Sequence, residues 1–340
     1  MAKAIVHVGV GKTGSSSLQT FFSHEGNDIL AAAGFVYGAV SGDGGILHGE
    51  KLSRIARRTP LGHLSSTPTI LQTANRERLR SDIAALSSQG LTPVFSQESW
   101  HRKALLFQDD AIFETLDCVV DIVAYVRPQV EWFNAAWWEW FAWDKLFSCP
   151  GDVVAKRGLN MMRWGTLLAR WKTVPRVSSV IVRLHPEDVV SDFLSVLGIP
   201  AADKAAQATR CNTGVSPTQL ELYRAAPGLR GIHGADMDHI LSGFLHDTNP
   251  PPWVIERELA SDIITRLGDD NHVLLEMLGD SQKTIMLDDQ RWWSAEAYAQ
   301  RFAESPVDTQ FTREQCLELI TRLARELLDE KNGRAVPTVP

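Results

Sequence analysis

The residues with the most evident chemical potential lie within the first twenty positions. Lys12 is followed by hydroxyl side chains at 13 and 15–17, directly after a short apolar stretch at 4–8, with glycines at 9, 11 and 14. Glycines let a backbone approach an anion closely, N–H groups at a helix start point toward it, and a lysine adds a positive charge. The pattern predicts a phosphate-binding turn between a strand at 4–8 and a helix at 15–22.

The spacing of this turn differs from that of the nucleotide-binding P-loop. That motif has a glycine five residues before the glycine of Gly-Lys-Thr, and the position here is Val6, inside the predicted strand. The segment instead resembles the 5′-phosphosulfate loop of sulfotransferases, especially the bacterial type, that use 3′-phosphoadenosine 5′-phosphosulfate (PAPS). The residues that match this loop are His7, Gly9, Lys12, Thr13, Gly14, Ser15, Ser16, Ser17, Leu18 and Gln19.

A second segment resembles the same family. Residues 117–127 form a nearly continuous apolar run, typical of a central parallel strand, and Pro128 suits the first turn of a helix. The family's 3′-phosphate-binding segment is hydrophobic-Tyr-hydrophobic-Arg-Pro-Gln, followed by a helix with a tryptophan and, eight residues after the arginine, a serine. The residues that match are Tyr125, Val126, Arg127, Pro128, Gln129 and Trp132.

The eighth position is a departure, because it holds Ala135. A hydrogen bond to a charged group contributes about 1.5–3 kcal/mol, so loss of this hydroxyl should weaken nucleotide binding unless another group replaces it. Asn134 is a candidate nucleotide-binding residue at this place, although it lies about 100° around the helix from position 135.

The resemblance implies an in-line transfer of a sulfuryl group from PAPS to an acceptor. Lys12 would stabilise charge on the leaving oxygen, and Arg127 would bind the 3′-phosphate. The scheme needs no metal and yields 3′-phosphoadenosine 5′-phosphate. The candidate nucleotide-binding residues are Gly11, Lys12, Thr13, Gly14, Ser15, Ser16, Ser17, Arg127 and Asn134.

The general base is expected to be a Glu or His beyond the second strand of the core, as in these sulfotransferases. Residues 92–99 read as that strand, and Glu98 is the first candidate. Its alternative role is that of a helix-capping or solvated acid. His101 and His48 are the reserve candidates.

Strands at 4–8, 92–99, 117–127 and 177–184 alternate with helices, which predicts the α/β class: a three-layer parallel sheet with ligand loops at the carboxyl ends of its strands. The resemblance implies a P-loop-NTPase-like sulfotransferase fold. We expect an α/β core at 1–205 and a mainly helical part of the same domain at 206–335. The glycine-rich stretch 34–66 is expected to be a solvated loop leading into a short helix, or a flap over the acceptor.

Composition narrows the function classes. The 340 residues are 44% hydrophobic and 22% charged, with a net charge of −7, so nucleic acid is not expected as a partner. No apolar run resembles a signal peptide or a membrane span, which predicts a cytoplasmic protein. Four scattered cysteines and ten histidines form no metal-ligand spacing, so no metal site is predicted. An aromatic stretch at 133–143 predicts core packing, or an apolar face for a small-molecule or carbohydrate acceptor.

Two other functions remain open from the residues. A small-molecule P-loop kinase would explain the anion-binding turn, but it needs magnesium ligands and the missing upstream glycine. A non-catalytic nucleotide-binding module would explain Ala135 as decay of the 3′-phosphate site.

Overall fold

The structure is a computed structural model that describes residues 1–59, 61–66, 73–200, 215–231, 237, 238, 241, 249, 251–303, 316, 317, 320 and 321. The chain forms two compact units. The first comprises Met1–Trp132, Arg157–Asn212 and Arg257–Tyr298, and the second comprises Phe133–Lys156, Thr213–Glu256 and Ala299–Pro340. This division differs from the expected boundary near residue 205, because segments from both halves of the chain contribute to each unit.

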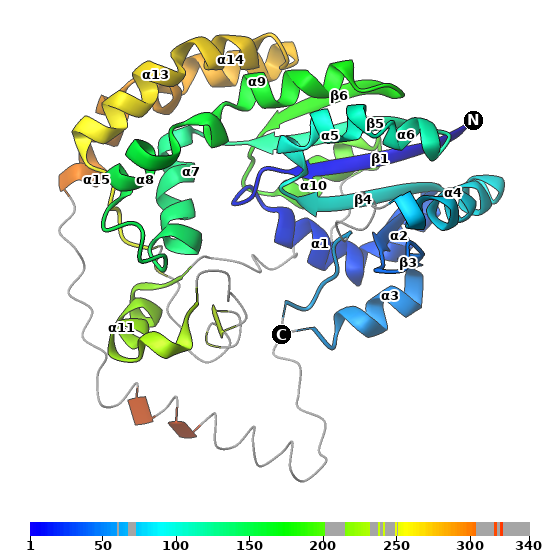
Figure 1. Ribbon diagram of the computed structural model, residues 1–340, viewed down its shortest axis with the longest axis horizontal. Coiled ribbons are helices and arrows are strands. Elements are labelled where there is room, and N and C mark those ends of the chain that lie inside the picture. The colour runs from blue at the N-terminus through cyan, green and yellow to red at the C-terminus, as the bar shows by residue number, and fades with distance from the viewer. Residues whose placement is uncertain are drawn as a thin grey trace. The chain divides into compact units, whose positions relative to one another are not determined.

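A six-stranded sheet forms the centre of the first unit. Its strand order is β3-β2-β4-β1-β5-β6, and every neighbouring pair is parallel except β2 with β3. Figure 1 shows β6, β5, β1 and β4 side by side in this order. The α/β class and the four strands expected from the sequence are confirmed. The strands are β1 (Ala2–Gly9), β2 (Phe35–Val40), β3 (Ile46–His48), β4 (Thr92–Glu98), β5 (Cys118–Val126) and β6 (Val177–Leu184).

The stretch 34–66 is more regular than expected. It contains β2, β3 and the helix α3 (Gly49–Ala56), so the prediction of a solvated loop was wrong for its first half. β2 pairs with β4 and is therefore an inner strand, and β3 pairs antiparallel with β2 at the edge. Glycines at 38, 42, 44 and 45 obscure the strand pattern, because glycine is depleted in strands and frequent in turns.

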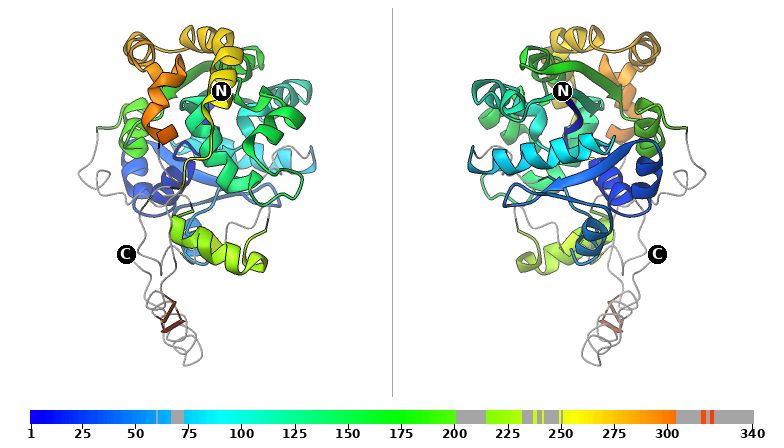
Figure 2. Two further views of the ribbon diagram at one scale, coloured as in Figure 1. Left: turned by 90° about the vertical axis from the view of Figure 1, so that its left-hand side faces the viewer. Right: turned by 90° about the vertical axis from the view of Figure 1, so that its right-hand side faces the viewer.

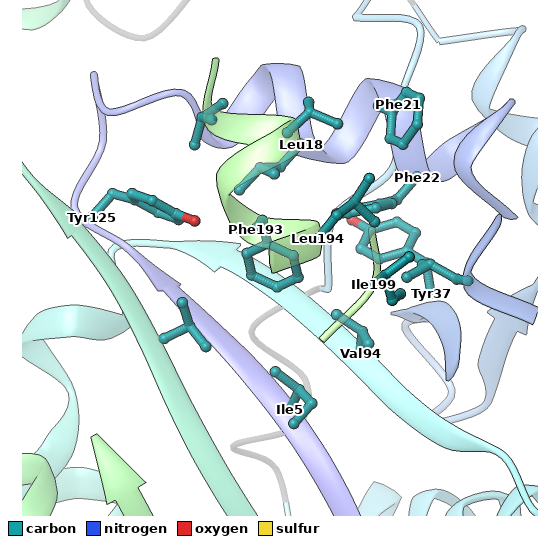
Figure 3. Packing of buried hydrophobic residues seen from close by; sticks show 14 of the residues in the cluster. Ile5, Leu18, Phe21, Phe22, Tyr37, Val94, Tyr125, Phe193, Leu194 and Ile199 are labelled. Atoms are coloured by element: carbon teal, nitrogen blue, oxygen red, sulfur yellow. The ribbon is translucent and has the colours of Figure 1, made fainter. Parts of the chain in front are cut away.

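Helices cover both faces of this sheet. Ile5 and His7 of β1 face α10, whereas the alternate residues Val6 and Val8 point to the opposite face, as the period of two in a strand requires. Figure 3 shows the core between the strands and the helices α1 and α10. The other helices of this part of the first unit are α1 (Ser15–Ser23), α2 (Gly26–Ala32), α4 (Thr73–Ser88), α5 (Ala104–Asp109), α6 (Ile112–Thr115), α9 (Trp164–Ala169) and α10 (Val189–Val196).

A later pair of helices returns to the first unit. α13 (Arg257–Leu275) packs along α9, and α14 (Asp280–Asp288) contacts β6 (Figures 1 and 2). At the crossing of α13 and α9, a Cβ on Gly165 would lie 2.3 Å from the Asp270 carbonyl oxygen, so only glycine permits this approach. The carboxylate of Asp270 accepts hydrogen bonds from the N–H groups of Gly165 and Thr166, at 2.9 Å each, and from the Thr166 hydroxyl at 2.5 Å.

The second unit has a small core of its own. The helix α7 (Gln129–Ala136) continues into a π-helical turn at Trp137–Phe141, and α11 (Pro217–Ala225) begins with a Ser216 cap. Trp138 and Trp143 pack against the buried residues of this core, which bears out core packing for that aromatic stretch. The other helices here are α8 (Pro150–Arg157) and α15 (Ala299–Ala303). Most of the stretch 304–335, which belongs to the part expected to be mainly helical, lies outside the described residues.

Candidate phosphate-binding site

The turn between β1 and α1 has an unusual backbone. Gly11, Lys12 and Gly14 adopt positive φ angles of 74°, 52° and 85°. Such angles cost a side-chain-bearing residue about 1–2 kcal/mol, so the surroundings must hold Lys12 in place. A Cβ on Gly14 would lie 2.7 Å from Val189 Cγ1 of α10, which makes glycine necessary here. The glycines at 11 and 14 therefore permit the tight turn that the sequence predicted.

Two side chains from the segment after β5 hold the carbonyl groups of this turn. The indole N–H of Trp132 donates to the Gly11 carbonyl at 3.0 Å, and Arg127 Nη1 donates to the Lys12 carbonyl at 3.3 Å. Because the C=O and N–H of a trans peptide point in opposite directions, the N–H groups of Lys12 and Thr13 are directed away from these two side chains. The loop thus has ordered amides, and the first N–H groups of α1 follow directly, without a side-chain cap.

The hydroxyl groups of the turn divide into two kinds. Thr13 and Ser15 are buried, and their hydroxyl oxygens have no hydrogen-bond partner among the residues that the structure describes. Ser15 Oγ points toward Gly9, where an added Cβ would lie 2.6 Å from it. Ser16 and Ser17 are half-buried at the helix start. Unpartnered buried hydroxyls are uncommon, and two within one turn mark it as a polar site.

Glu98 lies directly beside the start of this turn. It is the last residue of β4 and pairs in register with Gly9, the last residue of β1. A Cβ on Gly9 would lie 3.3 Å from Glu98 Cγ, and the Glu98 side chain is half-buried. The strand order β4-β1-β5 therefore brings Glu98, the turn and Arg127 to one edge of the sheet.

The two reserve histidines have different places. His101 is buried near the turn, and its Nδ1 donates a hydrogen bond at 2.8 Å to the Gly9 carbonyl, which can only accept one. Burial lowers the pKa of His101 to about 3, so its imidazole is neutral and holds its Nδ1 proton against the backbone. His48 is exposed on the edge strand β3, three strand spacings or about 14 Å from β1. The structure thus brings His101, but not His48, to the turn.

Asn134 has both ends of its amide occupied by backbone groups of the second unit. Its Oδ1 accepts from the Val254 N–H at 2.9 Å, and its Nδ2 donates to the Pro252 carbonyl at 3.3 Å. The side chain is buried. This placement favours a structural role, holding the segment before α13, over the predicted contact with a nucleotide.

Two residues that the sequence analysis did not single out lie beside Arg127. Its Nη2 donates to Glu131 Oε2 at 3.0 Å, and Arg291 Nη1 donates to Oε1 of the same carboxylate at 3.0 Å. Arg291 belongs to a short 3-10 helix, Gln290–Trp292. Glu131 follows Arg127 by four residues, a helical spacing that signals an ion pair, but no local pattern connects Arg291 with a partner 160 residues earlier.

A buried histidine supports the turn from within the strand. His7 Nδ1 lies 2.8 Å from Ser96 Oγ, which also accepts from Gln19 Nε2 at 3.0 Å. Burial lowers the pKa of His7 to about 4. His7 and Gln19 matched the sulfotransferase loop pattern, and both link the turn's flanking elements to β4.

Acidification is expected to destabilise the protein through these two buried histidines. An unfolded chain protonates His7 and His101 near pH 6.5, whereas the folded pKa values are about 4 and 3. The unfolded state therefore binds more protons than the folded state below pH 6.5. As the pH falls from there, the free energy of unfolding should decrease by roughly 3 kcal/mol per pH unit for the two histidines together. Urea unfolding between pH 7 and 4.5 measures this slope.

Matched asparagine variants separate this effect from titrating carboxylates. His7→Asn and His101→Asn keep an amide near each Nδ1 position and remove the titration, so each should reduce the pH slope by about half of the histidine contribution. Equal slopes in the wild type and in both buried-site variants would contradict this prediction.

The described residues contain no group of three or more His, Cys, Asp or Glu side chains arranged to hold a metal ion. Among the same residues, no helix has both the length and the apolar character needed to cross a membrane. Comparison of the chain with family models, with curated proteins and with solved structures gave no match.

Proposed function

We propose that this chain is a PAPS-dependent sulfotransferase that moves a sulfuryl group to a hydroxyl or amine of a small-molecule or carbohydrate acceptor. The observation that carries the proposal is the hydrogen bond from Arg127 to the Lys12 carbonyl. It joins the two segments that resemble the 5′- and 3′-phosphate sites of that family, although 115 residues separate them. A nucleotide with phosphates on both sides of one ribose needs two anion sites close together.

The proposed step is a single displacement at sulfur. The acceptor oxygen or nitrogen forms a bond to sulfur while the bond from sulfur to the bridging oxygen of the 5′-phosphate breaks. The leaving oxygen takes the electron pair, and 3′-phosphoadenosine 5′-phosphate departs. Positioning and electrostatic stabilisation supply most of the acceleration in transfers of this kind. Lys12 and the ordered amides of the turn would stabilise the charge that develops on the leaving phosphate.

Glu98 would receive the proton that the acceptor loses. Glu98 lies at the end of β4 next to Gly9, and therefore beside the turn that would hold the sulfuryl donor. We prefer it to His101, because the low pKa of that buried imidazole makes it a weak base and its Nδ1 proton is held by the Gly9 carbonyl. His48 stays a less favoured candidate on the edge strand.

Substitution of the proposed base should separate binding from turnover. Glu98→Gln keeps the shape and a polar group but cannot accept the proton, so transfer should fall about 100- to 10,000-fold while nucleotide affinity changes little. Transfer of labelled sulfate from PAPS into a cell extract, which supplies the unidentified acceptor, measures turnover. Glu114→Gln, on the exposed face of α6, is the matched control. Undiminished turnover in Glu98→Gln would remove this residue from the mechanism.

Nucleotide binding by itself tests the donor. Adenosine 3′,5′-bisphosphate at a hundredfold excess over its dissociation constant should stabilise the fold by about 2.7 kcal/mol, measured as a thermal shift. ATP with magnesium should give no comparable shift. The reverse result would favour a kinase, and a bisphosphate shift without sulfate transfer would favour a non-catalytic nucleotide-binding module. The kinase reading also lacks the upstream glycine of the P-loop, since Val6 lies within β1.

A further inference from the structure

We infer that Arg127 and Arg291 together form the clamp for the 3′-phosphate, and that the Glu131 carboxylate occupies this clamp until the nucleotide displaces it. The inference rests on the proposed function. It adds a second guanidinium to the nucleotide site and assigns an internal competitor to it. Neither Arg291 nor Glu131 belongs to the motifs that suggested the function.

The Glu131 carboxylate is held by two guanidinium groups, as an anionic ligand would be. Its two carboxylate oxygens each accept from a different guanidinium, at 3.0 Å from Arg127 Nη2 and 3.0 Å from Arg291 Nη1. The exposed fractions of the side chains are 21% for Glu131, 27% for Arg127 and 49% for Arg291, so the cluster is accessible to a solute. Two guanidiniums that converge on one pair of oxygens provide the planar donors that suit a phosphate.

A buried chain of amides holds the two arginines near each other. Gln129 Nε2 donates to Asn271 Oδ1 at 2.5 Å, and Asn271 Nδ2 donates to the Trp292 carbonyl at 3.0 Å. Gln129 lies two residues after Arg127, and Trp292 lies one residue after Arg291. Gln129 and Asn271 are buried, so this link is shielded from water and fixes the backbone beneath both guanidiniums.

A second set of contacts orients Arg291 itself. Its Nε and Nη2 each donate to Asp289 at 2.8 Å, and the Tyr298 hydroxyl donates to its carbonyl at 3.0 Å. With these atoms engaged, Nη1 is the part of the guanidinium that faces Glu131. The side chain is therefore set in advance in the orientation that would meet an anion beside Arg127.

This arrangement accounts for the departure at Ala135. The resemblance expects a hydroxyl there to donate to the 3′-phosphate, and the chain has none. Arg291 would supply a stronger, charge-assisted donor instead. A phosphate dianion also carries more charge and more acceptor oxygens than a carboxylate, so it can take both guanidiniums from Glu131, whose charge must then turn away to water.

The test uses one pair of nucleotides and two variants with opposite expected effects. Arg291→Gln should weaken binding of adenosine 3′,5′-bisphosphate about 10- to 100-fold, the loss expected for a hydrogen bond between charged groups. Binding of adenosine 5′-monophosphate, which lacks the 3′-phosphate, should not change. Glu131→Gln removes the competing charge and should tighten bisphosphate binding several-fold, again without an effect on the monophosphate. Titration calorimetry measures all six dissociation constants.

Controls distinguish a clamp from a structural ion pair. Arg266→Gln breaks an exposed pair with Asp262 elsewhere on α13 and should change neither affinity. Equal weakening of both nucleotides in Arg291→Gln, or no weakening of either, would overturn the inference, as would a loss of bisphosphate affinity in Glu131→Gln. If Arg291→Gln does not fold, the bisphosphate affinity of Glu131→Gln tests the inference by itself. Wild-type protein that binds neither nucleotide would instead refute the proposed function.

Discussion

Replacement of Lys12 by alanine is expected to slow sulfate transfer about 100- to 1,000-fold. Removal of a single preorganised donor to a developing oxyanion has effects of this size in other enzymes. Lys12 lies in the turn between β1 and α1, where it has a positive φ of 52°. The glycines at 11 and 14 in the same turn also have positive φ angles. The variant should lose more in transfer rate than in affinity for the bisphosphate product, because the charge that Lys12 would stabilise is greatest in the transition state.

Transfer of labelled sulfate from PAPS into a cell extract measures this effect. Lys172→Ala, which removes an exposed lysine far along the chain, is the matched control and should keep full activity. Lys12→Arg should recover part of the rate because it restores the charge. Retention of more than half of the wild-type rate in Lys12→Ala would exclude a catalytic role for this residue.

The second large effect concerns stability. Asp270→Ala is expected to lower the free energy of unfolding by about 3 kcal/mol, because it leaves the N–H groups of Gly165 and Thr166 without their acceptor at a buried helix crossing. Asp270 is only 2% exposed, so water cannot readily take its place. Asp270→Asn should be milder, since an amide oxygen can still accept one of these bonds. Urea denaturation followed by fluorescence measures the change.

A neighbouring aspartate on the same helix is the control. Asp262 pairs with Arg266 one turn away, and both side chains are about half exposed. Asp262→Ala should therefore change stability by about 0.5 kcal/mol or less. Similar losses in the two variants would show that Asp270 contributes only as an ordinary helix residue, and not as the link between α13 and α9.

The elements that carry the candidate site were predictable because each has a strong local signal. Apolar runs end at Gly9, Glu98 and Arg127, and parallel strands in an α/β sheet share one carboxyl edge, so their ends had to meet. The strands β2 and β3 lacked such a signal, since glycines interrupt the alternation of side chains. The assignment of chain segments to the two units could not be predicted either, because it depends on which distant segments pack together.

The hydrogen bonds that shape the site could not be read from spacing. Trp132 matched a family pattern, but its bond to the Gly11 carbonyl depends on how α7 is placed against the turn. The Arg291 side chain bonds Asp289, two residues earlier, but its contact with Glu131 joins positions 160 residues apart. The contacts of Asn134 were equally unreadable from spacing, because its amide bonds the backbone at 252 and 254, more than a hundred residues away.

The order of the strands has a consequence for synthesis on the ribosome. β1 lies between β4 and β5, whose residues follow it by roughly ninety and more than a hundred positions. At about 5–20 residues per second, the nascent chain waits about 6–23 s between completion of β1 and completion of β5. Through that interval an apolar strand has exposed backbone on at least one edge, and we expect this portion of the emerging polypeptide to be the one that chaperones engage.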